Sequence, residues 1–175
     1  MDLSSNSIGG YYENGRGYGK VIATPEGPKA IADALRVCAS VTHVDVRGNS
    51  IAGEGASSLS AAVLGNTMIE VFNEMPIKEM RANSLTELDL HGEGIGVEGG
   101  MVLAGLLPAM ASVTELNLYQ NSIKDEGVTA ICEALQSNKE TKLASLNIGA
   151  NSIGPAGAKS VAAMVAVIAS LTLVR

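Results

Sequence analysis

The chain has 175 residues, 18 acidic and 12 basic side chains, and a formal net charge of −6. Its length suits one domain, and its acidity argues against general affinity for nucleic acids, which depends on basic patches. The two cysteines, Cys38 and Cys132, match no metal or redox spacing and are expected as reduced core residues, which indicates an intracellular, cytoplasmic protein.

The N-terminal residues predict a short strand and a turn that recur along the chain. Met1-Asp2-Leu3 begins within a strand, and the tripeptide Asn-Ser-Ile follows. Four copies of this tripeptide begin at Asn6, Asn49, Asn121 and Asn151. With the degenerate copy Glu93-Gly94-Ile95, the intervals are 43, 44, 28 and 30 residues. A repeated period of about 28 residues predicts an array of units rather than a single-cored globule.

Residues 10–24 form an insertion after the first copy. Asn14-Gly15 is a strong hairpin signal, and we expect Tyr11-Tyr12 and Val21-Ile22 as its flanking strands. Tyr11, Tyr12 and Tyr18 are three of the five aromatic residues of the chain. An aromatic loop on a regular scaffold predicts an accessory contact site, but the same tyrosines would also serve to fold the loop back onto its own helix.

Each later unit predicts one strand followed by one helix. In Val44-Asp45-Val46 and Leu116-Asn117-Leu118 apolar and polar residues alternate, which is the period of a strand buried on one face. Six residues after each landmark a glycine opens a stretch with helical spacing, such as Val128-Ile131-Leu135. Neither half can bury its apolar side alone, so neighbouring units must stack.

The second interval contains a shortened unit at 69–84. Ile69-Glu70-Val71-Phe72 predicts the start of a strand, but Leu85 opens the next unit only 16 residues after Ile69. We therefore expect a repeat without its helix, in which Pro76 and the run after it form a short helical turn or an extended link. The solenoid should be thinner at this point.

The last residues, 171–175, predict one more strand. The apolar stretch 161–174 is bounded or interrupted by Lys159, Ser170 and Thr172 and is too short to span a bilayer, so no membrane association is expected. Both ends count as incomplete repeats without polar caps. This predicts a fragment of a longer array or self-association through an end, as a homo-oligomer.

The asparagine of each turn has a structural explanation. A buried carboxamide both donates and accepts hydrogen bonds, so it can join its own repeat to the adjacent one. The predicted ladder consists of Asn6, Asn49, Asn121 and Asn151. An ionised Glu93 cannot donate, so we expect that rung to be irregular or solvated.

The pattern L-x-x-L-x-L-x-x-N-x-I, followed by a glycine-initiated helix, resembles the leucine-rich repeat in its long, ribonuclease-inhibitor-like form. The resemblance covers nearly the whole chain. It implies an α/β fold: one domain over 1–175, a right-handed solenoid bent into a horseshoe arc with parallel strands on the concave face and helices on the convex face. The scaffold serves many partners, so function does not follow from it.

Outward positions of the predicted strands form the candidate binding face. Acids outnumber bases there, which favours a protein partner with a basic patch. The predicted partner-binding residues are His43, Asp45, Arg47, Asn73, Glu87, Asp89, His91, Glu115, Asn117, Tyr119 and Asn147. The sequence therefore predicts a non-enzymatic protein-interaction scaffold.

Residues with catalytic or metal-binding potential do not converge. His43 and His91 occupy different phases of the repeat, and no metal-ligand motif is present, so neither a metal nor a cofactor is expected. Glu87, Asp89 and Glu115 are predicted to lie close enough to perturb each other's pKa. An open sheet excludes no water, however, so a solvated acidic surface is the favoured interpretation.

Other functions are compatible with the same scaffold. Ribonuclease inhibitors are cysteine-rich and longer, whereas Ran GTPase-activating proteins share the acidic character. Arg47 is a conceivable arginine finger for that activity, although a shared scaffold alone does not support the role. The resemblance also fits the recognition module of a nucleotide-sensing receptor or a self-assembling fragment of a longer array.

Overall fold

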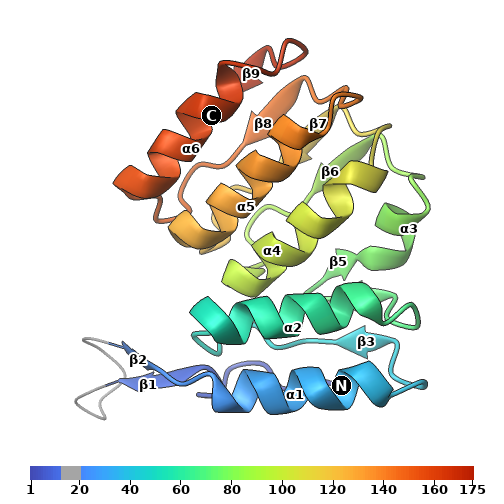
Figure 1. The fold of residues 1–175 in the computed structure, drawn as a ribbon, viewed down its shortest axis with the longest axis vertical. Helices are drawn as coiled ribbons and strands as arrows, with labels where there is room; N and C mark the ends of the chain where they lie inside the picture. The colour runs from blue at the N-terminus through green and yellow to red at the C-terminus, as the bar shows by residue number, and fades with distance from the viewer. Residues whose placement is uncertain (13–20) are drawn as a thin grey trace.

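The computed structural model describes residues 1–12 and 21–175, which form one arc of strand-and-helix units (Figure 1). The helices are α1 (Glu26–Val37), α2 (Gly53–Gly65), α3 (Ile77–Arg81), α4 (Gly96–Leu106), the 3₁₀ turn η1 (Leu107–Ala109), α5 (Lys124–Ser137) and α6 (Pro155–Val165). The strands are β1 (Gly10–Tyr12), β2 (Val21–Ala23), β3 (His43–Val44), β4 (Val71–Phe72), β5 (Met75–Pro76), β6 (Glu87–Asp89), β7 (Glu115–Asn117), β8 (Ser145–Asn147) and β9 (Leu173–Val174).

The alternation of strand and helix follows the periodicity of the sequence. Strands β6, β7, β8 and β9 form a parallel sheet, with Leu88 beside Leu116 and Leu116 beside Leu146. These central leucines are buried, whereas the residues on either side of them point away from the core. Helices α4, α5 and α6 pack side by side against the same aliphatic core. The predicted α/β solenoid is therefore confirmed.

Asparagines under the turns link successive repeats. Asn121 is fully buried; its Oδ1 accepts from Gly94 N (2.8 Å) and Ile95 N (3.2 Å), and its Nδ2 donates to Leu90 O (2.7 Å). Asn151 bonds the preceding turn in the same way, with its Oδ1 accepting from Asn121 N (2.9 Å). Each carboxamide therefore forms hydrogen bonds with backbone N–H and C=O groups of two repeats, and these groups have no partner within a strand or helix.

The first residues extend the array on the other side. Asp2 forms an isolated parallel bridge with Asp45, and Leu3 N donates to Asp45 O (2.8 Å). Asn49 accepts from Asn6 N and Ile8 N (both 3.2 Å). Asn6 itself is exposed and donates only to Leu3 O and Ser4 O, so its carboxamide does not link two repeats.

The inserted segment begins and ends as a hairpin. Tyr11 pairs with Ile22 in the antiparallel pair of β1 and β2, as the flanking residues predict. The side chain of Tyr11 is 54% exposed. Asn14-Gly15 and Tyr18, together with the side chain of Tyr12, lie outside the described part of the structure.

The shortened unit at 69–84 divides the strands of the repeats into two sheets, β3-β4-β5 and β6-β7-β8-β9, which are separate from the hairpin of β1 and β2. Strand β4 runs parallel to β3, but Asn73 and Glu74 take positive φ values of 47° and 63° and turn the chain back into β5, antiparallel to β4. In Figure 1, α1 and α2 share one direction and α4, α5 and α6 another, and the change lies between α2 and α4. The array therefore consists of two blocks: the first block contains α1, α2 and the sheet β3-β4-β5, and the second block contains α4, α5, α6 and the sheet β6-β7-β8-β9.

The full-length helix is missing from this unit, and the run after Pro76 forms the short helical turn, one of the two expected alternatives. The unit contains α3, a helix of five residues in place of the 11 to 14 found in the units around it. Ile77 and Met80 of α3 are fully buried. This one turn persists because it fills the space between the diverging C-terminal ends of α2 and α4 (Figure 1). Within the described residues, no helix combines the length and apolarity that crossing a membrane requires.

Candidate functional site

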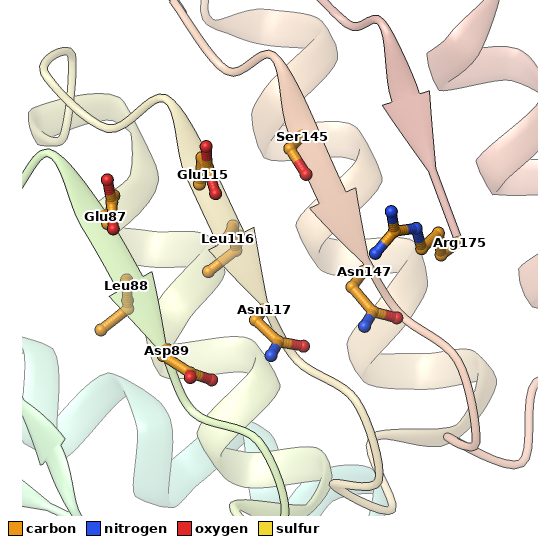
Figure 2. Close-up of a pocket in the computed structure, with 9 residues that line it drawn as sticks. All are labelled: Glu87, Leu88, Asp89, Glu115, Leu116, Asn117, Ser145, Asn147 and Arg175. Carbon is orange, nitrogen blue, oxygen red and sulfur yellow. The ribbon is translucent and has the colours of Figure 1, made fainter.

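The strand face, defined as the outward side chains of β3 and β6–β8 with the residues that follow them, is a polar surface, and Figure 2 shows its β6–β8 part. Parallel register aligns Glu87 with Glu115 and Ser145 in one row, and Asp89 with Asn117 and Asn147 in a second. The two rows line a depression of about 200 Å³, with Arg175 at its far side. The arrangement offers carboxylates at β6 and neutral amides at β8.

The carboxylates of β6 and β7 on the strand face form no ion pair within the described part of the chain. Glu87 and Glu115 are exposed and take part in none of the ion pairs found there. Adjacent strands lie about 4.8 Å apart, and like charges directly opposite each other are destabilising. The pair therefore lowers stability and remains available to a positively charged group.

An aromatic pair lies at the end of these strands. The rings of His91 and Tyr119 meet edge to face with centroids 5.1 Å apart, and Tyr119 is 38% exposed. A Cβ at Gly149 would lie 3.1 Å from Cδ2 of Tyr119, so glycine at that position leaves room for the ring. A partly exposed tyrosine at the edge of a polar surface is a typical anchor for a protein partner.

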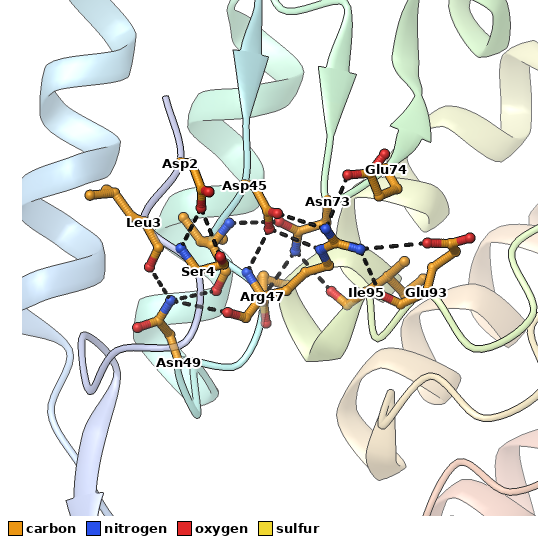
Figure 3. A network of polar contacts seen from close by, with 12 residues as sticks. Asp2, Leu3, Ser4, Asp45, Arg47, Asn49, Asn73, Glu74, Glu93 and Ile95 are labelled. Atoms are coloured by element: carbon orange, nitrogen blue, oxygen red, sulfur yellow. Dashed lines mark hydrogen bonds and ion pairs between the residues drawn. The ribbon is translucent and has the colours of Figure 1, made fainter.

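Around β3, carboxylates are neutralised by Arg47 (Figure 3). Arg47 contacts three carboxylates: Asp45 (2.7 Å), Glu74 (3.0 Å) and Glu93 (3.5 Å). The hydrogen bond from Arg47 lowers the pKa of Asp45 below its ordinary value. Among the predicted site residues, Asp45 and Arg47 are therefore bound to each other, while His43 is exposed. The unneutralised carboxylates of the face lie on the second block.

Asn73 is not on the surface, and its placement among the partner-binding residues is wrong. It is fully buried; its Oδ1 accepts from Val46 N (2.9 Å) and its Nδ2 donates to Ile95 O (3.0 Å). Because φ of Asn73 is positive, its side chain points inward. Its Oδ1 accepts the hydrogen bond from Val46 N that a backbone carbonyl of the next strand accepts in the regular repeats. Asn73 thus joins the two blocks.

Sequence reasoning missed one titratable residue. Glu98 is only 3% exposed, and its Oε1 lies 3.3 Å from Nδ2 of Asn73. Burial raises the pKa of Glu98 to about 7. Glu54 and Glu126 occupy the same phase of their helices and are exposed, so only the altered neighbourhood of the shortened unit distinguishes Glu98.

Metal ligands do not cluster in the described part of the chain: no group of three or more His, Cys, Asp or Glu side chains there could hold an ion. Cys38 and Cys132 are free thiols in separate units. The strand face itself presents groups for charge pairing and hydrogen bonding, such as Glu87, Glu115 and Asn117.

Comparison with known proteins gives the repeat a family context. A family model described as "Leucine Rich repeat" matches residues 37–60, 81–104, 109–132 and 139–162, which is more than half of the chain. Each matched segment contains one predicted strand and most of the helix after it.

Similar proteins are larger than this chain. RAN GTPase-activating protein 2 of Arabidopsis thaliana is 31% identical over 84 residues, 48% of this chain and 15% of that protein. NACHT, LRR and PYD domains-containing protein 13 of Homo sapiens is 32% identical over 111 residues, 63% of this chain and 9% of that protein. Ribonuclease inhibitor of Mus musculus is 29% identical over 107 residues, 61% of this chain and 20% of that protein. The chain thus spans at most a fifth of the length of these relatives.

Proposed function

We propose, from the premise that this chain belongs to the leucine-rich repeat family, that it is an interaction scaffold whose strand face binds a protein with a basic patch. Domains of this family typically bind proteins. The observation that carries the proposal is the pair Glu87 and Glu115, exposed on adjacent strands and in none of the ion pairs of the described residues.

The proposed contact surface centres on β6 and β7. Glu87, Asp89 and Glu115 would pair with lysine or arginine side chains of the partner. Tyr119, held by His91, would supply apolar contact and a face for a cation. Asn117 and Asn147 continue the rows with carboxamides that can donate as well as accept.

Two parts of the predicted site have smaller roles in this proposal. His43, Asp45 and Arg47 form the margin of the face, because Arg47 is engaged by carboxylates of its own chain. The hairpin of β1 and β2 is the accessory contact, with Tyr11 exposed at its base. Two free cysteines fit a partner encountered in a reducing, cytoplasmic compartment.

Charge reversal tests the proposal. A triple variant, Glu87→Lys, Asp89→Lys and Glu115→Lys, is compared with a control triple of the same charge change on exposed helix and loop residues, Glu79→Lys, Glu133→Lys and Glu140→Lys. A partner identified by pull-down and mass spectrometry should bind the first triple at least about tenfold more weakly and the control like the parent chain. Equal binding to all three proteins would exclude the strand face.

A second candidate function is activation of a small GTPase. The observation that favours it is the 31% identity to RAN GTPase-activating protein 2 over 84 residues. Three carboxylates hold Arg47, so any role for it as a catalytic finger would require those contacts to break first. GTP hydrolysis by small GTPases, measured with and without this chain, decides the matter. No acceleration removes this candidate and leaves the scaffold proposal intact.

A further inference from the structure

The shortened unit leaves one turn of the array without its usual neighbour. In the first turn and in the turns after β6 and β7, four backbone N–H groups donate to the next repeat, and three of them occupy the same positions in every one of these turns. After β6, Gly92 N donates to Tyr119 O (2.9 Å), Ile95 N to Asn121 Oδ1 (3.2 Å) and Gly96 N to Asn121 O (3.0 Å). The pattern is a carbonyl, a carboxamide oxygen and a second carbonyl, all from one tripeptide that ends in asparagine.

Two other turns repeat this pattern. After β7, Gln120 N, Ile123 N and Lys124 N donate to the tripeptide 149–151, with Asn151 Oδ1 again the middle acceptor. In the first turn, Ser5 N, Ile8 N and Gly9 N donate to the tripeptide 47–49, with Asn49 Oδ1 in the middle. Three turns thus share one mode of recognition.

The turn after β3 carries the same donors without acceptors. Gly48 N, Ile51 N and Ala52 N occupy the equivalent positions, and none donates to a protein acceptor within the described residues. The reason is topological, because the chain turns back at Asn73 before it can supply the tripeptide. The next donor, Gly53 N, donates to a carboxylate of α5, Glu126 Oε2 at 2.8 Å.

The space left by the missing tripeptide is a groove. It has a volume of about 430 Å³ and lies between the turn 48–51 and the turn 94–97, with Arg47, Glu98 and Lys124 along its walls. Glu98 is 3% exposed, and only its Oε1 is hydrogen-bonded to another side chain of the described residues. A buried carboxyl group at the groove provides an acceptor opposite the row of donors. The groove shares no residue with the depression on the strand face.

We propose that this groove binds an extended peptide segment of a partner protein through an asparagine, in the place of the tripeptide that the shortened unit does not supply. The carbonyl two residues before the asparagine accepts from Gly48 N, the carboxamide oxygen from Ile51 N, and the carbonyl of the asparagine from Ala52 N. The carboxamide NH₂ is left to donate to acceptors of the groove such as Glu98. Because the walls carry both signs of charge, a neutral carboxamide fits better than a charged side chain.

A peptide taken from the array itself is the probe. A capped synthetic peptide with the sequence of residues 118–124 contains the tripeptide that the turn after β6 recognises. Titrated into the ¹⁵N-labelled chain, it should shift the amide resonances of Gly48, Ile51 and Ala52 saturably, with a dissociation constant of about 1 mM or tighter. The same peptide with Asn121→Leu should bind about tenfold more weakly, because the Ile51 N–H is left unpaired.

Matched variants of the protein locate the site. Ser50 lines the groove, is exposed and has φ of 55°; Ser152 holds the same position in the turn after β8, with φ of 57°, outside the groove. Ser50→Tyr should abolish peptide binding and Ser152→Tyr should leave it unchanged. The proposal is overturned by equal binding of the two peptides, by no shift up to about 5 mM peptide, or by shifts confined to the turn 151–154 or the strand face.

Discussion

At the scale of single residues, buried asparagines hold neighbouring repeats together. Asn121 accepts two backbone hydrogen bonds and donates others while fully buried. Ser122, the next residue, has φ of 57° and makes the tight turn possible; Gly94 has φ of 69° at the same place in the degenerate copy. In these Asn-Ser-Ile turns, the residue after the asparagine has a left-handed backbone conformation, which directs the carboxamide of the asparagine at the adjacent turn.

Removing that carboxamide should be costly. We expect Asn121→Ala to lower the free energy of unfolding by about 3 kcal/mol, because several buried backbone groups lose their partner. Asn6→Ala should cost less than about 1 kcal/mol, since Asn6 is exposed and bonds only its own turn. Urea denaturation of both variants measures the difference, and equal losses would contradict the linking role of the ladder.

Glu98 should make stability fall as pH rises. Its pKa is about 7 in the folded chain against an ordinary 4.5, because burial disfavours the carboxylate. The folded state therefore holds the proton more tightly, so the contribution of Glu98 is complete below about pH 4.5 and is lost as pH rises through about 7. The loss is about 3 kcal/mol at most.

Glu98→Gln isolates this effect, because the neutral amide keeps the shape and does not titrate. Urea unfolding at about pH 5 and about pH 8 should show the variant gaining stability relative to the parent chain at the higher pH. Glu54→Gln, at the same phase of α2 but exposed, serves as the control. An unchanged difference between parent and Glu98→Gln at the two pH values would show that Glu98 ionises normally.

Sequence reasoning located the regular residues of the strand face and missed the exceptional ones. Glu87, Asp89 and Glu115 point outward because strand alternation directs them there. Asn73 satisfies the same alternation, but its positive φ reverses the direction of its side chain. Neither that backbone conformation nor the burial of Glu98 is encoded locally, since both depend on how the shortened unit meets the next one.

At the scale of elements, the shortened unit has one helical turn and side-chain contacts in place of a full-length helix. Arg81 lies at the end of α3, and its guanidinium donates to Val63 O (2.9 Å), Asn66 O (3.1 Å) and Ile69 O (2.9 Å). These carbonyls lie at the end of α2 and just after it, where intrahelical partners are missing. One side chain therefore closes the helix of the preceding unit.

Arg81→Met should reveal the weight of these contacts. The substitution keeps an apolar stem and removes the donors, so the free energy of unfolding should fall by about 2 kcal/mol. Lys78→Met, which removes the exposed ion pair with Glu70 on the same helix, should cost less than about 0.5 kcal/mol. Thermal unfolding of both variants gives the comparison, and similar losses would mean that Arg81 does not cap α2.

Element prediction succeeded wherever a full period was present. Helices α2, α4, α5 and α6 begin within a few residues of the glycines that mark them, at Gly55, Gly99, Gly127 and Gly157. Strand β5 was not predicted, and the sequence left a short helical turn and an extended link equally open for α3, because Met75–Arg81 is too short to show either period. Their conformation follows from the space between α2 and α4.

At the scale of the whole molecule, the two blocks meet through few polar links. Helices α2 and α4 pack directly, Asn73 bridges Val46 and Ile95, and Arg47 reaches Glu93. In repeat proteins, stability depends on contacts between neighbouring units. Cooperativity across this junction therefore depends on Asn73 more than on any single rung inside a block.

Asn73→Ala should separate the unfolding of the blocks. We expect a lower urea m-value or two resolved transitions, because the weakened junction no longer couples the two parts. Asn121→Ala removes a comparable buried rung inside the second block and should shift one transition without splitting it. Hydrogen exchange of β3 and β7 amides would identify which block opens first, and coincident transitions in Asn73→Ala would disprove the weak junction.

The shortened unit, residues 69–84, separates two blocks of regular repeats. Within the described residues, no strand of the sheet β3-β4-β5 pairs with a strand of the sheet β6-β7-β8-β9, so twist is not passed from one sheet to the other through strand pairing. We therefore expect that a whole repeat can be added to or removed from one block while the strand geometry of the other block stays the same. The shortened unit, where the sequence departs most from the repeat, is thus the place at which the two blocks can vary independently.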